Sequence, residues 1–203
     1  MIFNPKFLFK ATIDNVDIAA DAILNNQIIV YPTDTLYSFG ADATNSEALT
    51  TLNKIKNRTM PLSILLSDIN DIKKYGITND KIIRKIRFLF PGPYTILLKS
   101  KNNSTISNLV QAGSDKIGIR IIDNHFCNEL IDKIQRPIIT TSVNSHGNPP
   151  LTDIDKIQNQ FRNHHIFYDK KKLISKGSTI IDFSVLPEKI IRHGEGEYLN
   201  EIL

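Results

Sequence analysis

Short apolar runs of β-type residues alternate with helical patterns along this chain, and this alternation limits its fold more than any other feature. The runs lie at 27–31, 62–66, 94–99, 116–122, 137–142, 165–168, 178–183 and 188–192. Helical periodicity lies between many of them, at 14–25, 68–75, 79–89, 125–134 and 152–161, and the capping-box spacing Thr44–Glu47 opens a further helix. Strands that alternate with helices predict an α/β fold, in which a twisted sheet of mixed parallel and antiparallel strands is flanked by helices.

Length and composition favour one domain. The chain has 203 residues, of which 41% are hydrophobic, and no internal repeat, low-complexity tract or linker divides it. We therefore expect a single domain over residues 1–203. A single cysteine, Cys127, excludes an intramolecular disulfide, and no stretch approaches the roughly 20 apolar residues that span a bilayer. The sequence predicts a cytoplasmic protein without a membrane partner.

The charge pattern suits an anionic ligand. A formal net charge of +4 with both signs mixed is consistent with nucleotides or weak RNA contact. The five histidines lie in separate segments or side by side without ligand spacing, so we expect no protein-bound metal. Cys127 falls on a predicted helix, where a buried hydrophobe is expected rather than a nucleophile. The run Lys170–Lys172 is typical of a solvated turn, with contact to tRNA or a triphosphate as the alternative.

Polar residues gather at the ends of several predicted strands. They form four islands: PTDTLYSFG (32–40), KNRTMPL (56–62), TTSVNSHGNPP (140–150), and GSTIIDF with IIRHG (177–183 and 190–194). An open α/β sheet builds its ligand crevice at strand ends, so we expect these islands to meet there. An ordinary turn rarely needs Thr33, Asp34, Thr35 and Tyr37 together, and PTDTLYSFG therefore favours a small-molecule pocket.

Each island also has a structural interpretation when it is taken alone. Lys56 and Arg58 leave a predicted helix, and cations suit a helix C-terminus. Ser142 and Asn144 are typical turn initiators. Arg120 lies within an apolar run and cannot lose its charge, so it needs an anionic partner, either an internal carboxylate or one from a ligand.

Together the islands resemble the YrdC/Sua5 family of L-threonylcarbamoyladenylate synthases. The resemblance runs in order through AADAILNNQIIVYPTDTLY, GADATNSEAL, KNR, PGPYTILLK, GIRIIDN, TTSVN, STIID and IIRHG. It implies a YrdC-like open sheet with a concave basic face, of the short, single-domain type because the chain ends soon after IIRHG. It also implies synthesis of threonylcarbamoyl-AMP and pyrophosphate from L-threonine, bicarbonate and ATP with Mg²⁺. The product would serve N6-threonylcarbamoyladenosine (t6A) formation in ANN-decoding tRNAs, through a downstream tRNA threonylcarbamoyl transferase complex.

The same resemblance implies roles for single residues on the nucleotide side. Lys56 and Arg58 match the family's KxR motif and are expected to hold the ATP phosphates and the carbamate as the catalytic cations. Ser142 and Asn144 match its SxN motif and are expected to bind the nucleotide phosphates. Arg192 matches an arginine near the nucleotide.

On the amino-acid side, Arg120 matches the arginine that takes the threonine carboxylate. Thr33 and Thr35 match the hydroxyl-bearing loop beside threonine, and Ser178 matches a serine on the same ligand. The chain departs from the family pattern at Ser38, where glycine is usual, at Leu65, where many members have histidine, and in a loop after Arg58 that is about two residues shorter.

Two other functions stay open at this point. One is an RNA- or nucleotide-binding paralogue that has lost synthesis, which Ser38, Leu65 and the shortened loop favour. The other is a carbamoyl-adenylate activity on another substrate, as in the similar domain of hydrogenase maturation proteins. The intact KxR and SxN motifs favour the synthase.

Overall fold

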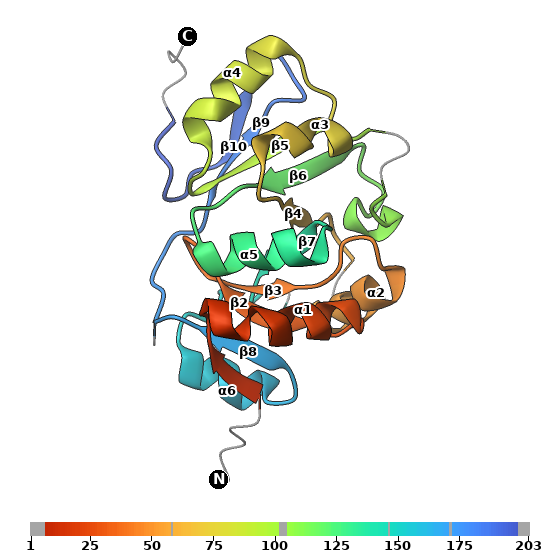
Figure 1. Ribbon diagram of the computed structural model, residues 1–203. Helices are drawn as coiled ribbons and strands as arrows, with labels where there is room; N and C mark the ends of the chain where they lie inside the picture. The colour runs from red at the N-terminus through yellow and green to blue at the C-terminus, as the bar shows by residue number, and fades with distance from the viewer. Residues whose placement is uncertain (1–6, 58, 102–104, 146, 171, 199–203) are drawn as a thin grey trace.

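One sheet of ten strands links the two ends of the molecule (Figure 1). The computed structural model describes residues 7–57, 59–101, 105–145, 147–170 and 172–198. The strand order is β1-β8-β2-β3-β7-β4-β6-β5-β9-β10. The strands are β1 Leu8–Lys10, β2 Ile29–Pro32, β3 Tyr37–Gly40, β4 Ser63–Leu65, β5 Tyr94–Lys99, β6 Lys116–Arg120, β7 Ile138–Ser142, β8 His165–Tyr168, β9 Thr179–Asp182 and β10 Lys189–Arg192.

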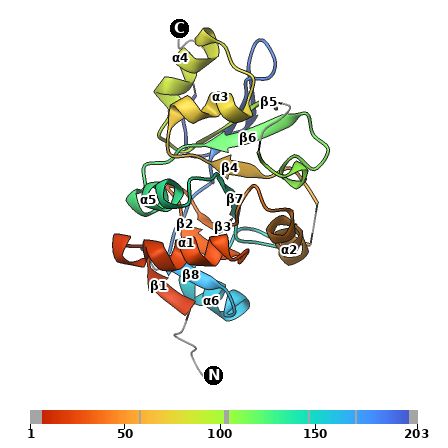
Figure 2. The ribbon, with the colours of Figure 1, turned by 45° about the vertical axis from the view of Figure 1, so that its right-hand side comes forward.

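Helices flank this sheet. They are α1 Val16–Leu24, α2 Ser46–Lys56, α3 Ile72–Tyr75, α4 Asp80–Leu89, α5 His125–Ile134 and α6 Ile154–Phe161, with 3-10 turns at Ile13–Asn15, Ile69–Asp71 and Asn108–Val110. Helices α1 and α5 lie side by side in both ribbon views, α6 lies near β8, and α3 and α4 lie at the other end beside β5 and β6 (Figures 1 and 2). Parallel pairs such as β4–β6 and antiparallel pairs such as β5–β6 occur in the same sheet, which confirms the predicted mixed α/β fold.

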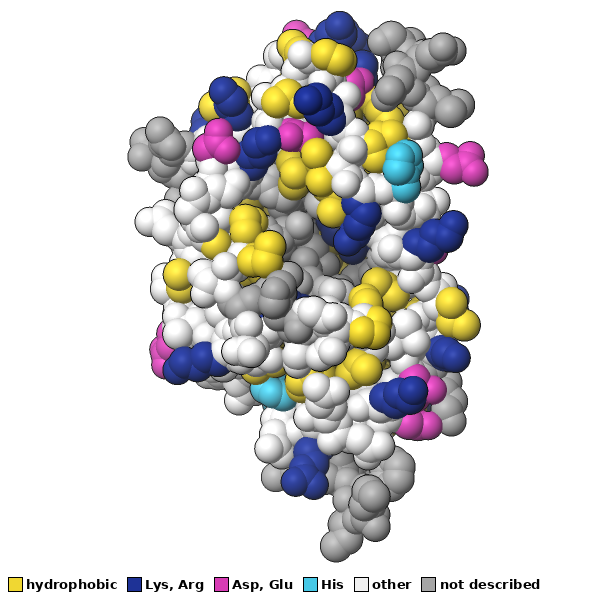
Figure 3. Space-filling view, turned by 180° about the vertical axis from the view of Figure 1, so that it is seen from behind, with side chains coloured by type: hydrophobic (Ala, Val, Ile, Leu, Met, Phe, Trp, Pro, Cys, Tyr) yellow, Lys and Arg dark blue, Asp and Glu magenta, His cyan; other side chains and the backbone are white. Residues whose placement is uncertain are grey.

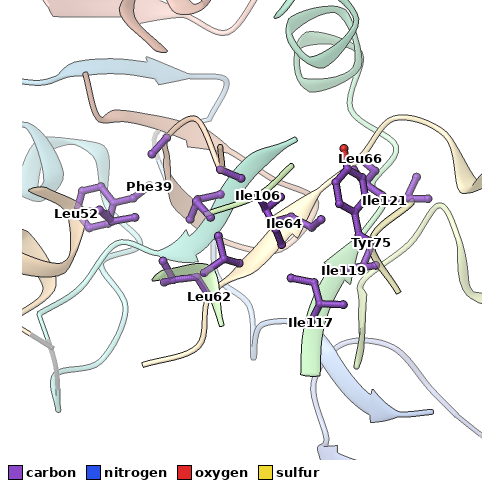
Figure 4. Close-up of a cluster of buried hydrophobic side chains, with 14 of the residues drawn as sticks. Phe39, Leu52, Leu62, Ile64, Leu66, Tyr75, Ile106, Ile117, Ile119 and Ile121 are labelled. Carbon is purple, nitrogen blue, oxygen red and sulfur yellow. The ribbon is translucent and has the colours of Figure 1, made fainter. Parts of the chain in front are cut away.

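Two clusters of apolar side chains hold these layers together. The smaller one joins α1 and α5 through Ala19, Ile23 and Leu130, and it includes Cys127. The larger one lines the sheet with Phe39, Ile64 and Ile119 among its members (Figure 4). Burying one such side chain contributes about 1.5–3 kcal/mol, so both clusters are major sources of stability.

Cys127 is fully buried, as the sequence predicted. Its thiol donates to the carbonyl of Pro32 at 3.4 Å, and burial raises the pKa of the thiol far above its ordinary value. A thiol held in the protonated form in the core is a poor nucleophile, so Cys127 acts as a small hydrophobe.

The stretch PTDTLYSFG forms the turn and the second strand of a β-hairpin, which the sequence analysis did not predict. Strand β2 pairs antiparallel with β3, and residues 33–36 make the turn between them. The alternation of buried aromatic Tyr37 and Phe39 with Ser38 is typical of a strand, but its short length hid this pattern among the polar neighbours. The three-residue strand β1, which pairs with β8, was also missed.

The predicted capping box of α2 is wrong by one residue. Asn45, not Thr44, is the N-cap, and its side chain accepts hydrogen bonds from the backbone N–H groups of Glu47 and Ala48. The Thr44 hydroxyl donates instead to the Asp42 carboxylate at 2.6 Å. An Asn amide competes successfully for a cap position because its oxygen reaches the N2 and N3 donors.

Candidate active site

Strand register brings polar side chains onto one face of the sheet. Ser38 pairs with Ser142 across β3 and β7, and Ser63 of β4 pairs with Thr140 of β7. Residues that pair across a ladder share a face, so these hydroxyls stand together although they come from three separate segments. The same face continues over β6, β5, β9 and β10 through the pairs Ser63–Gly118, Leu97–Gly118, Thr95–Ile180 and Ile180–Arg192.

A cavity of about 410 Å³ opens on this face. Hydroxyl and cationic side chains dominate its wall, and the lining residues are Thr35, Leu36, Ser38, Pro61, Leu62, Ser63, Thr95, Arg120, Thr140, Thr141, Ser142, Asn144, Pro150, Lys176, Gly177, Ser178, Ile180 and Arg192. Seen from behind, the molecule is hollowed near its centre, and Lys and Arg side chains stand at the edge of the hollow (Figure 3). Many hydroxyl donors beside cations suit a ligand rich in anionic oxygen atoms.

Arg120 ends β6 inside this cavity. Its side chain is 8% exposed, and its Nη2 donates to the Asp34 carboxylate and, at 3.3 Å, to the hydroxyl of Thr35. Its Nε is buried and has no hydrogen-bond partner among the described residues. Both interpretations from the sequence therefore hold in part, since Arg120 pairs with an internal carboxylate and also faces a cavity with donor capacity left.

The Asp34 carboxylate is the buried ionic partner of Arg120. Burial raises the pKa of Asp34 above its ordinary value, although the charge of Arg120 and its hydrogen bond act in the opposite direction. The pair is therefore costly to keep buried, and it is the kind of arrangement that functional sites retain in spite of that cost.

A second cationic centre of the cavity wall surrounds Ser178. The hydroxyls of Ser178 and Thr95 share a hydrogen bond of 2.7 Å. Arg192 donates to the Ser178 carbonyl from Nε at 3.1 Å and from Nη2 at 2.8 Å, and Nη2 also lies 3.1 Å from the Ser178 hydroxyl. Burial, and then the charge of Arg120, lower the pKa of Arg192. An anion bound beside both guanidinium groups would offset this repulsion.

Lys56 lies behind the loop that carries Ser142 and Asn144. It is 1% exposed, and its Nζ donates to the Ser142 carbonyl at 2.6 Å and to the Asn144 carbonyl and side-chain oxygen at 3.1 and 2.9 Å. The Ser142 hydroxyl donates to the same Asn144 oxygen at 2.8 Å. Lys56 also stands 5.6 Å from the Phe39 ring centroid. The ammonium group therefore fixes the loop that forms one wall of the cavity.

Thr33 shapes the hairpin turn rather than the cavity wall. Its hydroxyl donates to the Leu36 carbonyl at 2.7 Å and accepts from the backbone N–H groups of Thr35 and Leu36. This Thr-centred turn directs the side chains of Asp34 and Thr35 toward Arg120.

Most of the expected site residues meet at one cavity. Thr35, Arg120, Ser142, Asn144, Ser178 and Arg192 line it, while Lys56 supports its wall and Thr33 supports its hairpin. Arg58 lies outside the described residues. The ligand contacts expected of all nine residues remain predictions.

Sequence reasoning missed several lining residues. Ser63 and Thr95 lie inside apolar strands, Thr140 opens the island at 140–150 but was given no role, and Lys176 precedes the glycine of another island. The signal for Thr140 was available, because it stands two positions before Ser142 on a strand and so shares its face. Ser63 and Thr95 had no such signal, because their place depends on register between distant strands.

Ser38 and Leu65, the two strand residues that depart from the family pattern, have different places relative to the cavity. Ser38 lines it, and its hydroxyl accepts from that of Thr140 at 3.4 Å, so the extra side chain is absorbed into the hydroxyl wall. Leu65 shares the face of Arg120 but is fully buried in the apolar cluster beneath α1 and α5. It is therefore part of the core.

The described residues hold no group of three or more His, Cys, Asp or Glu side chains placed to bind a metal ion. Within that same part of the chain, the cavity wall carries hydroxyl groups, one amide and cations but no carboxylate. Such a donor set suits Mg²⁺ only when phosphates and water supply most of the ligands. In the described part of the chain, no helix has the length and apolar character that crossing a bilayer requires.

Comparison with known proteins places this geometry in a family. Residues 21–194 match the Sua5/YciO/YrdC family model, which is described as "Telomere recombination". A Methanocaldococcus jannaschii protein named "Putative threonylcarbamoyl-AMP synthase" is 38% identical over 178 residues, covering 86% of this chain and 82% of that protein. The "Threonylcarbamoyl-AMP synthase" of Photobacterium profundum is 28% identical over 156 residues, covering 74% of this chain and 83% of that one.

A solved structure shares the fold. The Pyrococcus abyssi Sua5 protein complexed with L-threonine superimposes with a TM-score of 0.83 at 24% identity, over 93% of this chain and 57% of that one. This chain thus spans a little over half the length of that Pyrococcus protein. On the extent of the family match and the identity to the Methanocaldococcus relative, the chain belongs to the Sua5/YciO/YrdC family.

Proposed function

We propose that this chain is a threonylcarbamoyl-AMP synthase, a nucleotidyltransferase that joins L-threonine, bicarbonate and ATP and releases pyrophosphate. The observation that carries the proposal is the hydroxyl-rich cavity that Arg120 and Arg192 both line. The names of the two relatives above and the L-threonine complex of the Pyrococcus protein support it.

The cavity has a buried end that suits the amino acid. Thr35, Arg120 and Ser178 are all buried there, and Arg120 keeps an unpartnered Nε among the described residues. A guanidinium group recognises a carboxylate with directed N–H donors, and hydroxyls of Thr35 and Ser178 can meet a ligand hydroxyl or carbamate oxygen. L-threonine would therefore bind with its carboxylate on Arg120.

The open end of the cavity suits the nucleotide phosphates. Ser142 and Asn144 lie on a loop that the buried Lys56 ammonium holds from behind, and this charge raises the local positive potential. The threonine amine forms an N–C bond with bicarbonate, a C–O bond of bicarbonate breaks, and water leaves, which gives a carbamate. The carbamate oxygen then attacks the α-phosphorus of ATP, the bond from that phosphorus to the β-phosphate oxygen breaks, and pyrophosphate leaves. Such a displacement depends on alignment and charge neutralisation more than on a dedicated acid or base.

Mg²⁺ is expected to enter with ATP, on its phosphate oxygens, and would neutralise part of the triphosphate charge. Hydroxyls such as that of Ser142 and the amide oxygen of Asn144 are the protein groups nearest in kind to its preferred ligands. The further partners, in this proposal, are the transferase complex that uses the product for t6A formation and, weakly, tRNA itself, in the cytoplasm.

Pyrophosphate release tests the proposal. Purified protein with Mg²⁺-ATP should release pyrophosphate only when L-threonine and bicarbonate are both present, and L-serine should be a poorer substitute. Release that ignores threonine would contradict the proposed reaction. ATP binding without any release would favour the nucleotide-binding paralogue.

A further inference from the structure

Lys176 lines the cavity as an exposed cation, with the Glu195 carboxylate as its charged neighbour. Its side chain makes no hydrogen bond or ion pair with a described residue. The other two cations of the wall are engaged, since Arg120 binds Asp34 and Arg192 binds Ser178. Among the described lining residues, Lys176 is thus the cation with its donors unused.

The backbone beneath this side chain is fixed. The Lys176 N–H donates to the Glu195 carboxylate at 2.6 Å, and the Glu195 N–H donates back to the Gly177 carbonyl at 2.8 Å. The Gly177 N–H donates to the Ser175 hydroxyl at 2.9 Å, and Gly177 has a φ of 80°, where a glycine is favoured. A side chain on Gly177 would also stand 3.3 Å from Arg192 Nη2.

A second glycine permits the close approach of the two segments. A Cβ on Gly194 would lie 2.3 Å from the Gly177 carbonyl oxygen and 2.4 Å from the Ser178 carbonyl carbon. The chain after β10 therefore packs directly against residues 176–178. These contacts hold the Lys176 backbone in place while its side chain is exposed to solvent.

We propose that Lys176 binds the terminal phosphates of the nucleotide and neutralises the charge that develops on the departing pyrophosphate. The identity of this anion rests on the proposed function. The buried residues Thr35, Arg120 and Ser178 are suited to an amino acid, so we expect the polyphosphate at the more exposed part of the wall, to which Lys176 belongs. A flexible ammonium group suits a mobile, highly charged phosphate as a point charge, without needing fixed geometry.

Nucleotide binding to matched variants tests this inference without depending on turnover. Lys176→Met should raise the Kd of Mg²⁺-ATP about tenfold, in line with the loss of one charge-assisted contact at an exposed site, and leave the Kd of AMP unchanged. Lys172→Met is the control, because Lys172 is exposed on the same segment but does not line the cavity. Lys176→Arg should retain most of the affinity for ATP.

Each outcome decides the point. An unchanged Kd for ATP in Lys176→Met, or an equal loss for AMP and ATP, would overturn the assignment, as would an equal effect of Lys172→Met. Thermal unfolding of each variant checks that the segment stays folded. If ATP binding depends on Lys176 but the wild-type protein releases no pyrophosphate with threonine and bicarbonate, then the phosphate site stands and the proposed synthesis fails.

Discussion

Removal of the Arg120 guanidinium should destabilise the protein in a manner that depends on pH. Asp34 Oδ1 accepts from Arg120 Nη2, and the two side chains are only 16% and 8% exposed. Arg120→Met keeps the aliphatic volume but leaves the carboxylate without its cation. Loss of one partner of a buried pair costs about 3–5 kcal/mol, and the partial exposure of Asp34 reduces our expectation to about 2–3 kcal/mol at pH 7.

The direction of the pH dependence follows from the pKa of Asp34. Burial already raises this pKa in the folded state with Arg120 present, and the substitution raises it further. A group with a raised folded-state pKa binds its proton more tightly when folded, so the penalty grows as pH rises through that pKa and shrinks as pH falls below it. The loss caused by Arg120→Met should therefore be smaller at pH 5 than at pH 7.5.

Urea unfolding at both pH values measures this effect. Arg120→Met combined with Asp34→Asn is the matched control, because it removes the buried charge together with its partner and should recover most of the lost free energy of unfolding. An equal loss at the two pH values, or a double variant no more stable than Arg120→Met, would refute the reasoning.

Three further perturbations test other parts of the structure. Lys56→Met should lower kcat/KM for pyrophosphate release, with a loss of about 2 kcal/mol or more of transition-state stabilisation, because the loop at one cavity wall loses its support. An unchanged kcat/KM would show that Lys56 does not contribute to the site. Gly194→Ala should cost about 1–3 kcal/mol in thermal unfolding, since its Cβ would meet the backbone of residues 177–178, and an unaffected variant would contradict the close packing. Burial alone raises the pKa of Glu188, but hydrogen bonds, first that from Lys85, outweigh it and bring the pKa from 4.5 to about 2. Glu188→Gln should therefore cost about 1 kcal/mol above pH 4.5, and the gap should close as pH falls toward 2; a gap that stays constant in acid would argue against the pair.

The local pattern of the chain allowed much of the fold to be predicted. Helices such as His125–Ile134 and strands such as Tyr94–Lys99 were predicted at their observed bounds, because each has a clear apolar period. Strand β3 was not predicted, because its four residues, with a serine between two aromatic residues, give too short a pattern beside a polar turn. The N-cap of α2 was predicted one residue too early, because Thr44 and Asn45 are both favourable N-cap residues. Which of the two caps the helix depends on the hydrogen bond between Thr44 and Asp42.

The sequence by itself determined which residue types this protein has for its chemistry, and in which order along the chain they appear. Thr35, Arg120 and Ser142 lie at or just after the ends of strands, Ser178 lies directly before one, and strand ends are where a sheet presents polar side chains. Only the tertiary structure decided which of them meet. Register across seven strands brings Ser63 and Thr95 to the wall, because pairing between distant segments is not encoded in any local period. The same long-range packing buries Lys56 behind its loop, joins Arg120 to Asp34, and leaves Lys176 exposed on the cavity wall.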